Sequence, residues 1–154
     1  MSDGYFTPDS DPHLFRCRCG RPDCEAPTVV HPALLLGLNE LRSRVDRPLR
    51  VTSGNRCPWW NRQQGGVDDG DDCRYTGDDS EHCDPTGTIG ADLACVTARE
   101  RDELLVAIYA RPRLFRRLGI GPAFVHVGTS ILHPQQVCWT YYPKKAHAQK
   151  APAG

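Results

Sequence analysis

The chain has 154 residues, of which 39% are hydrophobic and 25% are charged, and 19 Lys and Arg balance 19 Asp and Glu. These values are typical of an ordinary globular protein and give no reason to expect a polyanionic partner. The charges are unevenly spread, because Asp68 to Asp84 is strongly acidic and no Asp or Glu follows Glu103. We expect one domain over residues 1–154, with an extended arm at 1–13, a folded core at 14–143 and a flexible tail at 144–154.

The sequence has no apolar run long enough to span a membrane, and its first residues do not predict a secretory leader. We therefore expect synthesis in the cytoplasm and no membrane partner.

We interpret the acidic segment as a solvated loop. Its Asp68–Asp72 stretch lacks the spaced ligands and terminal Glu of a calcium-hand loop.

Two segments have the apolar spacing of an amphipathic helix. From Pro32 to Val45, leucines recur at intervals of three and four residues, and Pro32 suits a first helical turn. A second helix is predicted after the capping box formed by Thr97 and Glu100, and it should end before Pro112.

The β-rich segments are short and are separated by turn residues. We predict strands at 48–52, 88–94, 123–127 and 137–142, and a turn at Gly119 and Gly121. This order of elements predicts a small α+β domain. We expect a mainly antiparallel sheet, two principal helices and long loops.

Eight cysteines are many for such a chain, and three of them lie close together near its beginning. Cys17, Cys19 and Cys24 would hold a structural zinc ion if a fourth ligand, such as Cys57, joined them. A disulfide with a neighbour and a set of reduced, partly buried thiols are equally compatible with this spacing.

A second candidate site combines two imidazoles and one carboxylate. His82 precedes a predicted strand, Asp92 lies near the end of that strand, and His126 lies in the middle of another. Because side chains alternate along a strand, the valines on either side of His126 should point into the core. Two histidines and one carboxylate leave a position open on a zinc ion, which suits hydrolysis.

Several short motifs occur in an order that is similar to a known family. They are Ser53-Gly54-Asn55-Arg56, Asn61 followed by Gly65-Gly66, Ser80-Glu81-His82, Ala91-Asp92 and Phe124-Val125-His126-Val127. Together with the cysteine-rich entry and the leucine-rich helix, they resemble the zinc peptidoglycan peptidases. The resemblance is to the D-alanyl-D-alanine carboxypeptidase and L-alanyl-D-glutamate endopeptidase type, especially its bacteriophage and prophage branch. It covers roughly residues 15–139.

The resemblance implies roles for individual residues. His82, Asp92 and His126 would be the zinc ligands. Arg56 would bind a substrate carboxylate or neutralise a developing oxyanion, and Ser80 would form a hydrogen bond within the site.

The chain also departs from the family pattern. The spacing from His82 to Asp92 exceeds the usual seven residues, Asn55 replaces a tyrosine, and Gly128 stands where the family commonly has aspartate. A zinc peptidase needs a general base, and that aspartate is missing. The replacements that the sequence offers are Glu81, Asp84, another acid of the 68–84 segment, or His133.

We expect a zinc-dependent hydrolase that cleaves peptide bonds of bacterial cell-wall peptidoglycan, as a carboxypeptidase or an endopeptidase of phage origin. Its partner would be the wall peptide, reached after lysis or from a phage particle. The alternative is a catalytically inactive structural or wall-binding module, such as a virion or tail component that contacts other phage proteins. A nucleic-acid module is a weaker prediction, because the basic residues are scattered.

Overall fold

The computed structural model describes residues 5–7, 13–66 and 80–141. Most of the predicted arm, the acidic stretch before Ser80 and the predicted tail from residue 144 lie outside these ranges. Within them, no helix combines the length and the apolar character needed to cross a membrane.

A five-stranded sheet forms the centre of the molecule. Its order is β1 (Val51–Ser53), β2 (Gly90–Ala94), β4 (Phe124–Gly128), β3 (Arg117–Ile120) and β5 (Val137–Thr140). Neighbouring strands are antiparallel except β3 and β5, which are parallel. The small α+β domain with a mainly antiparallel sheet is therefore confirmed.

Two helices have the local signals that the sequence predicts. Helix α1 (Pro32–Val45) begins after His31, whose side chain accepts a hydrogen bond from the Ala33 backbone N–H. Helix α3 (Ala98–Tyr109) begins with a complete capping box between Thr97 and Glu100. The third helix, α2 (Pro58–Gln63), was not predicted, because six residues are too few for a clear apolar period.

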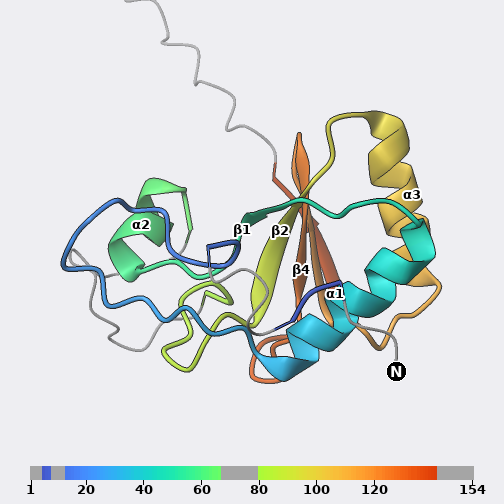
Figure 1. Cartoon of the computed structure of the whole chain (residues 1–154). Helices are drawn as coiled ribbons and strands as arrows, with labels where there is room; N and C mark the ends of the chain where they lie inside the picture. The colour runs from blue at the N-terminus through green and yellow to red at the C-terminus, as the bar shows by residue number, and fades with distance from the viewer. Residues whose placement is uncertain (1–4, 8–12, 67–79, 142–154) are drawn as a thin grey trace, which may run out of the picture.

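Helices α1 and α3 cover one face of the sheet, and α2 lies on the other side (Figure 1). Leucines of α1 and α3 pack against strand residues that include Leu93, Val125 and Val127, all fully buried. The alternation predicted around His126 is therefore observed. Asp92 and His126 consequently project from the face of the sheet that these two helices leave uncovered.

Strand boundaries differ from the predicted ones by a few residues, and one strand was missed. The first strand is Val51–Ser53 rather than 48–52, and the others begin or end up to two residues away. The predicted turn at Gly119 is wrong, since Gly119 lies inside β3. The turn begins at Gly121, whose N–H donates to the Phe124 carbonyl. A glycine in a strand weakens the sequence signal, because it removes a side chain from the β pattern.

Candidate metal centre

The sheet brings two candidate ligands together directly. Asp92 of β2 and His126 of β4 are paired across adjacent strands, so their side chains share one face. His82 comes from the loop before β2, and this loop is fixed by hydrogen bonds from Arg56 N–H to the His82 carbonyl and from Ile89 N–H to the Glu81 carbonyl. Strand pairing and loop attachment therefore place three residues distant in sequence in one cluster.

Backbone and side-chain acceptors orient both imidazoles. His82 Nδ1 lies 2.7 Å from the Gly54 carbonyl oxygen, and His126 Nε2 lies 3.0 Å from Glu81 Oε2. Each acceptor holds a proton on the nitrogen that faces it. His82 Nε2 and His126 Nδ1 are thus the nitrogens turned toward Asp92. Metal-binding histidines commonly donate their other ring N–H to a carbonyl or carboxylate in this way.

The spacing of the three ligand atoms fits a zinc ion. His82 Nε2 lies 3.2 Å from His126 Nδ1, and Asp92 Oδ1 lies 3.3 Å and 2.9 Å from those two nitrogens. Ligands bound tetrahedrally at zinc–ligand distances near 2.1 Å would be separated by about 3.4 Å. Among the described residues, three offer nitrogen and oxygen donors at nearly this spacing, and three protein ligands leave a fourth position for water or substrate.

The ion pairs within the cluster shift the pKa values of its members. Burial opposes charge on His126, but Asp92 and Glu81 outweigh it and raise the pKa of His126 to about 9. Burial lowers the pKa of His82, with Asp92 opposing the shift. Burial also opposes ionisation of Asp92, yet the two histidines hold the pKa of that carboxyl well below its usual value. A metal ion would replace the proton that His126 Nδ1 shares with Asp92.

Arg56 fixes the carboxylate ligand. Its guanidinium donates to Asp92 Oδ2 at 2.6 Å and to Ser53 Oγ at 2.8 Å, and Asn61 Oδ1 accepts at 3.2 Å. The Arg56 side chain is only 13% exposed. The sequence predicted substrate binding by Arg56. The structure places this residue beside the cluster, where it also orients Asp92.

Glu81 orients His126, as Arg56 orients Asp92. Its carboxylate is 3% exposed and receives hydrogen bonds from His126 Nε2, from Arg117 Nε at 3.1 Å and from the Ser130 backbone N–H at 3.0 Å. It therefore lies against the imidazole edge opposite the metal-facing nitrogen. In this position Glu81 orients His126, and its role as one of the several possible general bases stays a prediction.

The position of Glu81 also explains the glycine that follows the third ligand motif. A Cβ atom added at Gly128 would collide with the carboxylate group of Glu81. The space next to His126 that an aspartate at position 128 would enter is thus filled by a carboxylate from another part of the chain. A side chain at position 128 and the buried Glu81 carboxylate would therefore compete for the same space.

A cavity of about 870 Å³ adjoins the three ligands. Four arginines line it, whereas Glu81 and Asp92 are its only lining carboxylates among the described residues. The arginines are Arg16, Arg18, Arg56 and Arg117. Arg56 and Arg117 pair with the two carboxylates, but no described carboxylate pairs with Arg16 or Arg18. One wall of the cavity is therefore positively charged and exposed.

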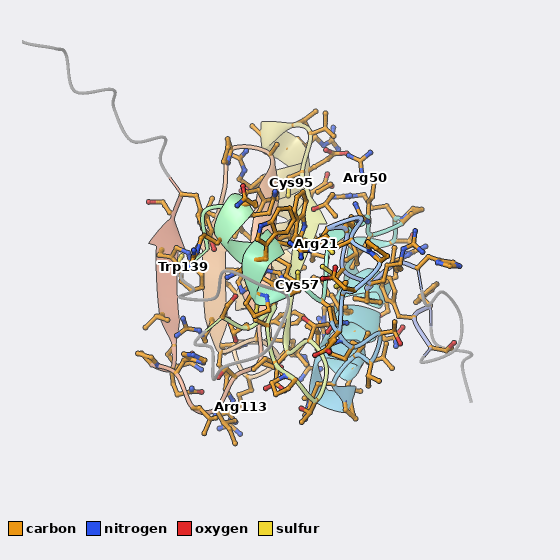
Figure 2. The ribbon with its side chains drawn as sticks, turned by 90° about the vertical axis from the view of Figure 1, so that its left-hand side faces the viewer. Arg21, Arg50, Cys57, Cys95, Arg113 and Trp139 are labelled. Carbon is orange, nitrogen blue, oxygen red and sulfur yellow. The ribbon has the colours of Figure 1, made fainter. Side chains whose placement is uncertain are left out.

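An aromatic wall faces His126. Gly119 of β3 lies opposite both His126 and Trp139 in the sheet, and a Cβ there would come within 2.8 Å of the Trp139 ring. This gap lets Trp139, labelled on edge strand β5 in Figure 2, reach to a centroid distance of 5.5 Å from His126. Tyr141 also lines the cavity. Their spacing of two residues in a β-rich segment is the signal that could have identified this wall.

The remaining predicted residues are placed differently. Ser80 lines the cavity and donates a hydrogen bond to Asn61 Oδ1 at 3.3 Å. His133 lies in the loop after β4, with Nδ1 2.5 Å from Ser130 Oγ, and is not among the residues that line this cavity. The four cysteines Cys17, Cys19, Cys24 and Cys57 converge in a second cluster.

Comparison with known proteins agrees with this geometry. The family model described as peptidase M15 matches residues 10–127, which is more than half of the chain and includes all three candidate ligands. Comparisons with curated proteins and with solved structures gave no match. The matched region also includes Glu81 and ends one residue before Gly128. The chain belongs to the peptidase M15 family.

Proposed function

We propose that this protein is a zinc-dependent hydrolase that cleaves peptide bonds of bacterial peptidoglycan. The observation that carries the proposal is the convergence of His82, Asp92 and His126, with ligand spacing suited to zinc, beside a cavity in a peptidase M15 chain. Three protein ligands with an open fourth position are typical of catalytic rather than structural zinc.

Zinc bound to these residues would polarise an amide carbonyl and lower the pKa of a water molecule. The protein's own groups prepare the site for this chemistry. Arg56 orients Asp92, while Glu81 and the Gly54 carbonyl orient the two imidazoles. The ligands are less than a tenth exposed, which limits competition from bulk water.

The charge of the cavity favours an anionic peptide substrate. Arg16 and Arg18 are exposed at the cavity wall and have no acidic partner among the described residues. They are two positions apart in the chain, separated by Cys17. Guanidinium groups bind carboxylates with two parallel hydrogen bonds. Wall peptides carry free carboxylates, so these arginines support such a substrate for either carboxypeptidase or endopeptidase cleavage.

One observation favours a second function. Both described carboxylates that line the cavity are held by other groups, Glu81 by Arg117 and His126, and Asp92 by Arg56. Neither is available as a general base toward the open metal position. The second candidate is therefore a catalytically inactive wall-binding or structural module that retains the metal.

The deciding experiment measures zinc content and release of peptide or amino acid from purified peptidoglycan. We expect turnover by the parent chain and loss of both turnover and one zinc ion in His126→Ala. His13→Ala, an exposed histidine outside the cavity, is the matched control. Zinc without turnover, combined with binding to intact wall material, would establish the second function instead.

Substrate charge can be tested with Arg18→Ala and Arg16→Ala. If the arginines bind a carboxylate, KM should rise several-fold for a peptide with a free carboxylate, and less for its amidated form. A mainly lowered kcat would place these arginines in a different role.

We further propose a phage origin, with action at the wall after lysis or from a phage particle that includes other structural proteins. The family resemblance described above supports this origin. Recovery of the chain in purified particles would establish the particle route, and its restriction to lysates would favour release at lysis.

A further inference from the structure

The second cysteine cluster has the geometry of a closed metal site. The Sγ atoms of Cys17, Cys19, Cys24 and Cys57 all lie within 4.8 Å of one another. Four thiolates bound tetrahedrally to zinc at about 2.3 Å would be separated by about 3.8 Å. The other described cysteines, Cys83, Cys95 and Cys138, do not belong to this group.

Backbone N–H groups point at the sulfurs. Arg21 N–H donates to Cys19 Sγ at 3.4 Å, and Cys57 N–H donates to Cys17 Sγ at 3.2 Å. Trp60 N–H donates to Cys57 Sγ at 3.4 Å. Such donors stabilise the negative charge of metal-bound thiolates. A neutral disulfide would gain less from them, so this arrangement favours thiolates over a bridge.

The loop that carries three of the cysteines is shaped around them. Gly20 has a φ of +71°, a conformation that glycine adopts readily, and it turns the chain between Cys19 and Arg21. Arg21 then pairs with Asp23 at 3.0 Å and lies 5.3 Å from the centre of the Trp59 ring on α2. Figure 2 labels Arg21 and Cys57 near this helix. The loop is thereby held against the segment that supplies Cys57.

We propose that Cys17, Cys19, Cys24 and Cys57 bind a zinc ion in a closed, structural site separate from the candidate metal centre. Four sulfur donors select a thiophilic metal and leave no position for substrate. The proposal stands on the geometry of the cysteines and does not depend on the proposed peptidase activity.

This cysteine site would join two walls of the cavity. Arg16 and Arg18 line the cavity and alternate with Cys17 and Cys19, which face the cluster. Cys57 directly follows Arg56, the residue that holds Asp92. One ion on these sulfurs would therefore set the positions of the exposed arginines and of Arg56 together.

The test counts metal ions on the full chain, purified under reducing conditions. We expect two zinc ions per chain, and one in His126→Ala. That variant loses only the candidate metal centre of His82, Asp92 and His126, called the open site below. Cobalt substituted into His126→Ala should give the intense near-ultraviolet absorption of thiolate ligands. Removal of Cys19 from the parent chain should lower the count from two to one.

Matched controls are Cys95→Ala, which is buried outside the cluster, and Cys138→Ala, which is exposed. Both should keep two ions. The His126→Ala measurement retains all four cysteines, so it decides the question even if Cys19→Ala does not fold. The proposal is overturned if His126→Ala binds no metal or if its cobalt form lacks thiolate absorption. It is also overturned if the mass of the unreduced parent chain is lower by two hydrogens for each disulfide among these cysteines.

Discussion

The candidate metal centre and the cysteine cluster bring candidate metal ligands together in different ways. The first uses nitrogen and oxygen ligands, two of them on paired strands, and charged side chains orient them. The second uses sulfur ligands from loops, and backbone N–H groups orient them. The first keeps a position open beside a cavity, whereas the second surrounds its centre. An open position is typical of catalytic metal sites, whereas four sulfur ligands are typical of structural ones.

The largest effect should come from Asp92→Ala. This change removes a candidate metal ligand and leaves the Arg56 guanidinium without its carboxylate in a largely buried place. We expect complete loss of metal from the open site and of any hydrolysis, with destabilisation of about 3 kcal/mol. Metal analysis and denaturant unfolding would measure both. If zinc at the cysteine cluster disappears as well, the two sites are not independent.

Glu81→Gln should weaken the open site without dismantling it. Glutamine can still accept the His126 hydrogen bond, but it removes the negative charge that faces the imidazole and Arg117. We expect zinc affinity to fall about 10- to 100-fold, the range found for orienting partners of metal ligands. Competition with a chromophoric chelator would measure it. An unchanged affinity would show that Glu81 does not support His126.

The open site should bind zinc more tightly as pH rises. In the metal-free fold the pKa of His126 is raised to about 9, so near pH 7 its ring carries a proton that zinc must displace. Affinity should increase by up to about tenfold per pH unit below pH 9 and level off above it. Titrations of the parent chain, compared with those of His126→Ala, which retains only the cysteine site, would show this slope. A slope that falls with pH would contradict the protonation scheme.

The smallest net effect should come from the double variant that exchanges the two carboxylate positions. Gly128→Asp alone places a side chain where the Glu81 carboxylate lies, so we expect destabilisation of about 1–3 kcal/mol. Combining it with Glu81→Ala should recover part of that loss, because the clash is removed and a carboxylate remains near His126. Unfolding measurements on both single variants and the double variant would detect the coupling. Simple additivity would mean that the two positions do not share one space.

Local signals in the sequence determined much of the fold. Apolar spacing and caps placed α1 and α3 correctly, because those signals lie within a few residues of each other. Ordered motifs also singled out the three residues that converge at the open site, and spacing drew attention to the cysteines. Strand β3 was not predicted, because Gly119 interrupts the β-rich pattern of its residues. The space beside Gly119 is filled by the Trp139 ring, which comes from another strand.

Only the tertiary structure decided how the site is supported. Glu81 resembled a free acid next to His82, yet pairing of β2 with β4 brings it to the far edge of His126 and into the space beside Gly128. Arg117 reaches it from β3. The order of motifs along the chain could indicate the candidate ligands, but not the groups that orient them. Those groups depend on which strands become neighbours, and that depends on packing across the whole sheet.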